Sequence, residues 1–278
     1  MLQKQVSNLH EQIRIQHSIS ICLCQQKKHE KADRFSVIKP RKGQYKLKQA
    51  NIKVAGRDIR GIIFDMDGLL LDTEALYLKA WLPVGEMMGV PITEAVARKT
   101  IGHDNEKTTV IFQEHYGKAF SMERAKPLLL EWIQDYVAKH GLRVKPGVRK
   151  LLKLLKQRGL PLAIGSSNQG QYVRAYLEEV GLLPYFDTIV TADLVERAKP
   201  APDIFLQAAQ NLGFSTEQCL VLEDSPIGVQ AAHEAGCLTI VVPDLMEPCA
   251  VTRGRVWQVL SSLEKVPELL FGANATCG

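Results

Sequence analysis

The sequence lacks both a hydrophobic run long enough to cross a membrane and a closely spaced pair of metal-binding cysteines. Its longest apolar runs, such as residues 238–242, have the length of a strand, whereas a transmembrane helix needs about 18 or more apolar residues. The six cysteines include no Cys-x-x-Cys pair, which argues against a structural zinc site and a disulfide framework. The one apolar stretch of the N-terminus, residues 18–24, is short and broken by serines, so a secretory signal is not expected, and a transit peptide is the weaker alternative. We therefore expect a cytoplasmic protein with reduced cysteines and no membrane span.

Charge is unevenly distributed along the chain. Residues 1–57 carry 13 Lys and Arg and 3 Asp and Glu, a net charge of +10, whereas residues 58–278 carry 22 and 27, a net charge of −5. A basic, Gln-rich segment without hydrophobic periodicity is typical of disordered chain. Residues 1–57 are therefore predicted to be a disordered extension, with weak contact to a polyanion or a membrane surface as its alternative role. The acidic remainder gives no reason to expect a nucleic-acid partner.

Short apolar strands alternate with helical patterns after residue 58. The predicted strands are 61–64, 160–164, 187–190, 219–222 and 238–242, and the predicted helices are 148–158, 171–180, 202–212 and 226–235. Each of these helices stops at a glycine, which is a common helix C-terminal signal. Because the strands are continuously apolar, both faces of the sheet are expected to be covered. The pattern predicts an α/β fold with a Rossmann-like parallel sheet.

Residues 75–145 interrupt this alternation. They contain helical patterns and no clear strand; the patterns, the first of which begins one residue earlier, cover residues 74–88, 93–99, 105–116 and 121–140. We interpret this interval as an all-helical cap inserted between the first two strands. The core then comprises residues 58–74 and 146–278, and Lys145-Pro146-Gly147 is the expected return hinge.

Polar side chains follow the predicted strands at their carboxyl ends. Because ligands bind at this edge of an open parallel sheet, these side chains are expected to line one site. They are Asp65, Asp67, Ser166, Lys199, Glu223 and Asp224. The carboxylates suit a hard divalent cation such as Mg²⁺, and the hydroxyl and ammonium groups suit phosphoryl oxygens.

The two aspartates after the first strand can take complementary roles. Asp65 could attack phosphorus and form an aspartyl-phosphate. Asp67 lies two residues further along extended chain, so its side chain can point the same way. It could protonate the leaving oxygen and then accept a proton from the attacking water. Mg²⁺ bound by Asp65 and Asp224 would reduce the repulsion between the nucleophile and the phosphate.

Four segments resemble, in order, the four motifs of the haloacid dehalogenase-like (HAD) hydrolase superfamily. They are Phe64–Glu74, Ser166 after its strand, Lys199–Phe205 and Leu222–Val229. The helical insert is similar to the small cap of the β-phosphoglucomutase-like and pseudouridine-5′-phosphatase-like branch. The resemblance implies an aspartyl-phosphate mechanism with Mg²⁺ as the cofactor.

The resemblance also implies a role for each residue. Asp65 would be the nucleophile and Asp67 the acid and base. Ser166 and Lys199 would hold the phosphoryl group. The metal ligands would be Asp65, the backbone carbonyl of Asp67, and Asp224, with Glu223 in or behind that shell.

Two positions separate a phosphatase from a phosphomutase within this branch. β-Phosphoglucomutases typically carry a His where this sequence has Tyr77, and an Arg where it has Asn105. An Arg suits the binding of a second phosphate, so its absence favours a phosphatase. The expected substrate is a small phosphomonoester, either a sugar phosphate or a nucleotide-like monophosphate. A phosphomutase and a non-catalytic binding protein on the same core are the alternatives.

Several polar residues near these motifs have simpler structural interpretations. Asp72 and Thr73 are predicted to cap the first cap helix. Ser166 could itself be a helix cap, although Ser167 or Asn168 can serve instead. His103 faces either the substrate or the solvent.

Overall fold

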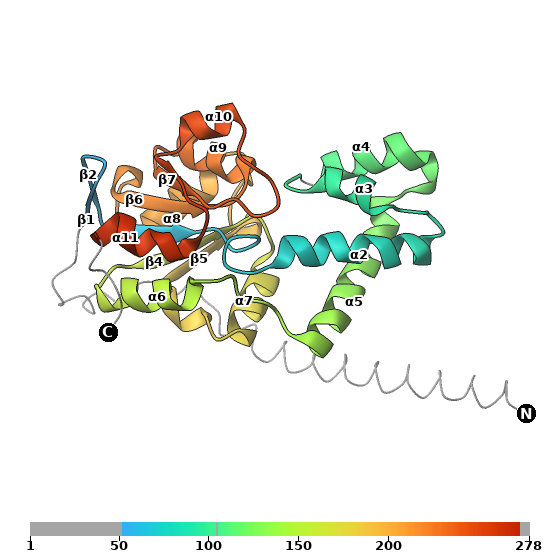
Figure 1. Cartoon of the computed structure of the whole chain (residues 1–278), viewed down its shortest axis with the longest axis horizontal. Helices are drawn as coiled ribbons and strands as arrows, with labels where there is room; N and C mark the ends of the chain where they lie inside the picture. The colour runs from blue at the N-terminus through green and yellow to red at the C-terminus, as the bar shows by residue number, and fades with distance from the viewer. Residues whose placement is uncertain (1–51, 104, 273–278) are drawn as a thin grey trace, which may run out of the picture. The chain divides into compact units, whose positions relative to one another are not determined.

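Six parallel strands form the central sheet of the computed structural model, which describes residues 52–103 and 105–272 (Figure 1). The strands are β3 (Gly61–Phe64), β4 (Leu162–Ser166), β5 (Thr188–Thr191), β6 (Cys219–Glu223), β7 (Leu238–Val241) and β8 (Gln258–Val259). Their spatial order is β5-β4-β3-β6-β7-β8. The chain winds outward from β3 on one side and returns to β6 on the other, so β3 and β6 meet where ligand sites form in such sheets. The predicted Rossmann-like parallel sheet is confirmed.

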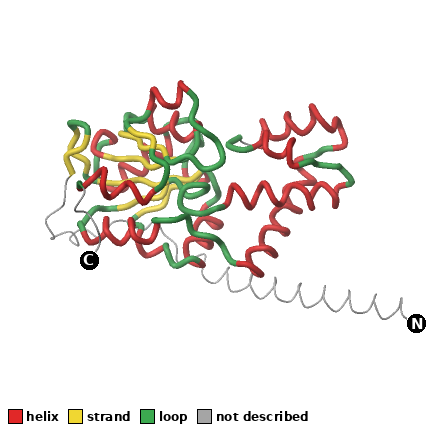
Figure 2. The backbone as a smooth tube through the Cα atoms, in the orientation of Figure 1, coloured by secondary structure: helices red, strands yellow, loops and turns green. Residues whose placement is uncertain are grey.

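Helices cover both faces of this sheet, as Figure 2 shows with the strands in yellow and the helices in red. They are α6 (Val148–Gln157), α7 (Gly170–Glu179), α8 (Asp203–Leu212), α9 (Pro226–Glu234) and α11 (Val266–Phe271). Ile62 and Phe64 of β3 pack in one hydrophobic cluster with α6, α7 and α11, whereas Ile63 packs in another with α8 and α9. Because successive side chains of a strand point to opposite faces, one apolar run contributes to both cores.

A short hairpin precedes the sheet. Strands β1 (Ile52–Val54) and β2 (Arg57–Ile59) pair antiparallel, and both residues of the turn between them, Ala55 and Gly56, have positive φ angles. Ile52, Val54 and Ile59 are buried against the core. The prediction that residues 1–57 are disordered is therefore wrong for residues 52–57. Apolar and charged residues alternate in the hairpin, and this alternation gives it an apolar face to bury. The prediction for residues 1–51 lies outside the described residues.

Four helices form the insert between β3 and β4. They are α2 (Thr73–Met88), α3 (Glu94–Ala97), α4 (Asn105–Tyr116) and α5 (Met122–His140). Their apolar faces surround a separate hydrophobic cluster. Within it, the ring centroid of Phe112 lies 4.7 Å from that of Trp81 and 4.6 Å from that of Phe120. We call this insert the cap.

Backbone hydrogen bonds join the two linkers that connect the cap to the sheet. Asp72 N donates to Arg143 O at 3.0 Å, and Lys145 N donates to Leu70 O at 2.9 Å. Lys145 Nζ also lies 3.7 Å from Asp72 Oδ1 and pairs with the carboxylate of Asp244, which follows β7. Within residues 52–103 and 105–272, no helix combines the length and hydropathy needed to cross a membrane.

Candidate active site

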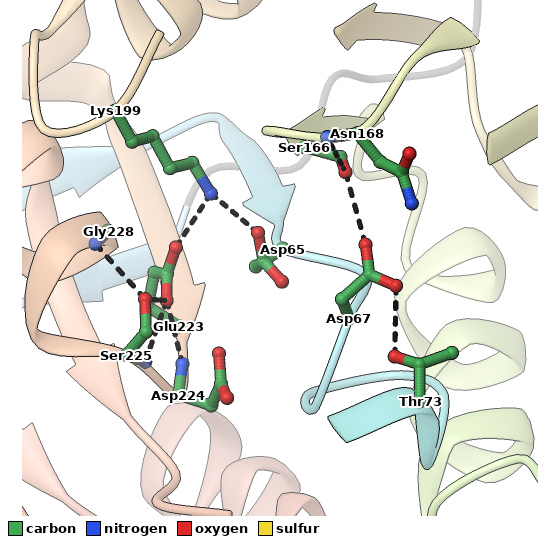
Figure 3. Close-up of polar contacts among 10 residues, drawn as sticks. All are labelled: Asp65, Asp67, Thr73, Ser166, Asn168, Lys199, Glu223, Asp224, Ser225 and Gly228. Carbon is green, nitrogen blue, oxygen red and sulfur yellow. Dashed lines mark hydrogen bonds and ion pairs between the residues drawn. The ribbon is translucent and has the colours of Figure 1, made fainter. Parts of the chain in front are cut away.

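The candidate site lies at the carboxyl ends of β3, β4 and β6 (Figure 3). Asp65 directly follows β3, and its backbone N donates to Leu222 O of β6 at 3.0 Å. The chain then turns through Gly68, whose N donates to Leu71 O at 2.9 Å. This turn brings the start of α2 back toward Asp67.

Lys199 lies between two carboxylates. Its Nζ is 2.5 Å from Asp65 Oδ1 and 2.7 Å from Glu223 Oε1, and only 3% of its side chain is exposed. Burial alone would lower the pKa of Lys199, but the charges of Asp65 and Glu223 outweigh it and raise that pKa. The lysine is therefore a fixed positive charge beside Asp65.

Glu223 uses both of its carboxylate oxygens within the protein. Oε1 accepts from Lys199, while Oε2 accepts from the backbone N of Asp224 at 2.9 Å and from the backbone N and hydroxyl of Ser225 at 2.9 and 3.0 Å. The start of α9 approaches so closely that a Cβ at Gly228 would lie 1.6 Å from Glu223 Oε1. Of the two places expected for Glu223, these contacts favour the one behind the metal ligands.

Asp67 is held on the other side of the site by two hydroxyl groups. Thr73 Oγ1 donates to Asp67 Oδ1 at 2.9 Å, and Ser166 Oγ lies 3.4 Å from Asp67 Oδ2. The pKa of Asp67 is raised by burial, and these hydrogen bonds oppose the rise. The site thus favours a proton on Asp67 to a higher pH than on an exposed aspartate.

The predicted capping role of Asp72 and Thr73 is confirmed for the position of Asp72 but not for a capping hydrogen bond. Asp72 occupies the N-cap position of α2 but makes no side-chain capping hydrogen bond. Thr73 is 1% exposed, and its hydroxyl donates to the half-buried carboxylate of Asp67, which is a stronger acceptor than a neutral group. Ser166 does not cap a helix either, because α7 begins at Gly170 and Ser166 Oγ accepts from Asn168 N at 3.0 Å.

Asp224 lies against the turn that follows Asp65. A Cβ placed on Gly68 would be 2.2 Å from Asp224 Oδ2, so only glycine allows this approach. Burial is the largest cause that raises the pKa values of Asp65 and Asp224 well above the ordinary value. The charge of Glu223 adds to the rise at both groups and that of Asp65 adds to it at Asp224, whereas Lys199 opposes it.

This donor set fits Mg²⁺. Within the described part of the chain, no group of three or more His, Cys, Asp or Glu side chains is arranged as a metal site. Mg²⁺ does not need such a group, because it commonly binds through one or two carboxylates and keeps several waters. In this binding mode Asp65 and Asp224, whose carboxylates repel each other, would be the two ligands, and a cation beside them would relieve the repulsion.

A cavity of about 260 Å³ opens over these residues. Its lining includes Asp65, Asp67, Lys199 and Asp224 from the sheet edge, and Gly102 and His103 from the cap. A second cavity of about 200 Å³ lies within the cap and includes Tyr77 and Asn105. His103 and Glu74 line both cavities. His103 is also exposed to solvent, so it combines the two orientations expected for it.

Glu74 is an acidic residue of this cavity to which the sequence analysis gave no role. Burial, and then the charges of Asp67 and Asp244, raise the pKa of Glu74 to about 7. The one sequence feature that could have drawn attention to Glu74 is its position directly after Thr73. Its raised pKa could not be predicted from the sequence, because Asp244, which contributes to it, is remote in sequence and adjacent only in the fold.

Comparison with known proteins agrees with this geometry. Residues 62–242 match the family model described as haloacid dehalogenase-like hydrolase. The chain therefore belongs to the haloacid dehalogenase-like hydrolase family, and the predicted family membership is confirmed.

Its relatives in this family include named phosphatases. The chain is 35% identical over 178 residues to the phosphorylated carbohydrates phosphatase of Thermotoga maritima, covering 64% of this chain and 82% of that protein. It is 34% identical over 208 residues to hexitol phosphatase A of Escherichia coli, covering 74% and 93%. Among solved structures, CbbY from Rhodobacter sphaeroides in complex with phosphate is 26% identical, with a TM-score of 0.62 and coverage of 75% and 96%. The prediction of an enzyme of the phosphatase type within this family is confirmed.

Proposed function

We propose that this protein is a Mg²⁺-dependent phosphatase that hydrolyses a small phosphomonoester through a phosphorylated Asp65. The observation that carries the proposal is the division of the site. Asp65 lies beside the buried cation of Lys199, while Asp67 is held apart from it by Thr73 and Ser166. This division supports a nucleophilic role for Asp65, beside a charge that can bind phosphate, and an acid and base role for Asp67.

The proposed first step transfers the phosphoryl group to Asp65. A carboxylate oxygen of Asp65 forms a bond to phosphorus while the bond from phosphorus to the ester oxygen breaks. Asp67 gives its proton to that leaving oxygen. Lys199 and the hydroxyl of Ser166 bind the phosphoryl oxygens as negative charge moves through them.

The second step releases phosphate. Asp67, now ionised, accepts a proton from a water molecule, whose oxygen attacks phosphorus and frees the Asp65 carboxylate. The residues that would hold Mg²⁺ are Asp65, Asp224 and, through its backbone carbonyl, Asp67. The ion would supply positive charge that offsets the negative charge of the phosphate. Glu223 would position Lys199 because its own oxygens are already occupied.

The cavity favours a substrate with a single phosphate. The described residues that line it include five carboxylates and one lysine, and the carboxylates are Asp65, Asp67, Glu74, Asp224 and Asp244. Apart from Lys199, no Lys or Arg among the described residues lines this cavity, so a second phosphate would lack a cationic partner there. Hydroxyl groups, in contrast, could donate hydrogen bonds to Glu74 and Asp244. This charge pattern supports a phosphatase over a phosphomutase. A sugar phosphate or a nucleotide-like monophosphate has the expected chemistry.

Two variants test the mechanism. Asp65→Asn should lose nearly all turnover while keeping the wild-type melting temperature, because it removes the nucleophile and almost no volume. Asp67→Asn should retain phosphate on Asp65, visible as a mass increase of the intact protein. Wild-type turnover in Asp65→Asn, or full turnover without a mass increase in Asp67→Asn, would refute the assigned roles.

A substrate screen separates the alternatives. A panel of phosphomonoesters, assayed with Mg²⁺ and with a chelator, should reveal Mg²⁺-dependent phosphate release. No hydrolysis across the panel would favour a binding protein. Conversion of β-glucose 1-phosphate to glucose 6-phosphate in the presence of a bisphosphate primer would favour a phosphomutase.

A further inference from the structure

A third cavity lies at the hinge between the cap and the sheet. Its volume is about 440 Å³, larger than either active-site cavity, and it shares no lining residue with them. The start of α2, the end of α5 and the return linker form its walls. We call it the hinge cavity. The polar and charged side chains of its lining are those of Asp72, Lys79, Tyr136, His140 and Arg143.

The hinge cavity adjoins the backbone ladder that joins the two linkers. Asp72 and Arg143 both line it, and Asp72 N donates to Arg143 O at 3.0 Å. Leu71 and Val144 continue this contact as an antiparallel bridge. A molecule in this cavity would therefore touch both linkers and the cap helices that they carry.

The basic groups of the hinge cavity have no acidic partner among the described residues. Lys79 Nζ bonds the neutral hydroxyl of Tyr136 at 3.0 Å and lies 4.5 Å from the centroid of its ring. The ring of His140 packs against the same tyrosine, with a centroid distance of 4.4 Å. No ion pair is formed by the side chain of Arg143 within the part of the chain that the structure describes.

The single acidic group of the cavity, Asp72, shares Lys145 with Asp244, which lies closer to that lysine. Asp72 Oδ1 lies 3.7 Å from Lys145 Nζ, and Lys145 does not line the cavity. Because the exposed side chains of Lys79 and Arg143 lie in the same lining as Asp72 alone, the charged groups of the cavity have a net positive charge. A cavity of this size with a net positive lining is suited to a small anion.

We propose that the hinge cavity binds a small phosphate-bearing anion and that binding there restrains the movement of the cap. A guanidinium offers two parallel N–H donors to phosphate oxygens, and an ammonium and an imidazole add further donors. Because Lys79 belongs to α2 and Arg143 to the return linker, one bound anion bridges two segments that must shift when the cap moves. The binding does not depend on the reaction proposed above.

The restraint follows from differential binding. A ligand shifts a conformational equilibrium only if it binds one conformation better than the other. Lys79 and Arg143 line one cavity in the arrangement described here, so an anion that contacts both would stabilise this arrangement over those in which the two residues separate. Cap movement limits turnover in many enzymes with lids, and the expected result is a lower kcat when the hinge cavity is filled.

Direct titration tests the binding. In calorimetry, the Mg²⁺-loaded full chain should bind inorganic phosphate at two sites, and Lys79→Met/Arg143→Met should keep only the active-site one. Each single variant should weaken the second site about tenfold, equivalent to about 1.4 kcal/mol. Lys139→Met removes an exposed charge of α5 that does not line the cavity, so it should keep both sites. One site in the wild type, or two unchanged sites in the double variant with a normal melting temperature, overturns the proposal.

Two further measurements identify the source of the anion and test the restraint. With Asp65→Asn blocking turnover, ribose 5-phosphate and glucose 6-phosphate should displace phosphate from the hinge cavity if a phosphorylated metabolite is the ligand. If inorganic phosphate binds there more tightly than either sugar phosphate, the ligand is phosphate itself, which is the product of the proposed reaction. With p-nitrophenyl phosphate as substrate, phosphate should lower kcat and raise KM in the wild type but only raise KM in Lys79→Met/Arg143→Met. A lowered kcat that persists in the double variant overturns the restraint.

Discussion

Replacement of Glu74 by glutamine should change how the stability of the protein depends on pH. The pKa of Glu74 is raised from 4.5 to about 7 by burial and by the charges of Asp67 and Asp244. The folded state therefore binds the Glu74 proton more tightly than the unfolded state does. Stability from this group is fully present below pH 4.5 and is lost as pH rises through about 7.

The size of the effect follows from the shift. One pKa unit corresponds to about 1.36 kcal/mol, so ionising Glu74 costs the folded state about 3 kcal/mol relative to the unfolded state. Most of this, about 2.5 kcal/mol, should be lost between pH 5 and pH 8. Glu74→Gln keeps the shape of the side chain and has no proton to lose. Between pH 5 and pH 8, its free energy of unfolding should therefore fall by about 2.5 kcal/mol less than that of the wild type.

Urea unfolding at pH 5 and pH 8, in the presence of a chelator, measures this difference. Subtracting the variant's change in the free energy of unfolding from that of the wild type removes the pH dependence of the other acidic groups, which both proteins share. Glu86→Gln is the matched control, because it removes an exposed carboxylate from the same helix. The reasoning fails if Glu74→Gln loses as much stability as the wild type between the two pH values, or if Glu86→Gln reproduces its effect.

Three further predictions concern the residues around the acidic cluster. Thr73→Val should lower kcat about tenfold or more without a matching change in KM, because it removes a hydrogen bond to a charged group, which contributes about 1.5–3 kcal/mol. Thr73→Ser keeps the hydroxyl and should restore kcat. An unchanged kcat in the valine variant would show that Thr73 does not position Asp67. Gly228→Ala should lower the free energy of unfolding by about 1–3 kcal/mol because its Cβ would overlap Glu223, whereas Gly254→Ala, with open space around it, should not. Saturating Mg²⁺ at 100 times its Kd should stabilise the wild type by about 2.7 kcal/mol and Asp224→Asn by much less, and equal shifts in thermal unfolding would exclude Asp224 as a ligand.

The sequence predicts those parts of the fold that have a local signal. Strands β3 and β6 are continuous apolar runs that end in acidic residues, so both their position and their polar ends could be predicted. Strand β8 has only two half-buried residues, Gln258 and Val259, and no apolar run. The β1–β2 hairpin was missed because its three buried residues are separated by charged ones in a basic segment.

The site residues were predictable as a set, but their contacts were not. Strand ends could bring Asp65, Asp67 and Lys199 to one edge, yet the sequence contains no distance. That Lys199 binds Asp65 and Glu223 together, and that Thr73 bonds Asp67, depends on the loop after β5 and on the turn at Gly68. Such long-range contacts arise from tertiary packing, which periodicity does not encode.

The attachment of the cap has a consequence for protein engineering. The two linkers are held to each other by main-chain hydrogen bonds between Asp72 and Arg143 and between Leu70 and Lys145, which any side chain except proline at the donor positions can preserve. The helices beyond them have their own hydrophobic interior. Residues 75–140, which leave Thr73 and Glu74 of the active site in place, can thus be treated as a transplantable module. Grafting the corresponding helices of a relative onto this scaffold should transfer substrate preference while the catalytic edge of the sheet stays intact.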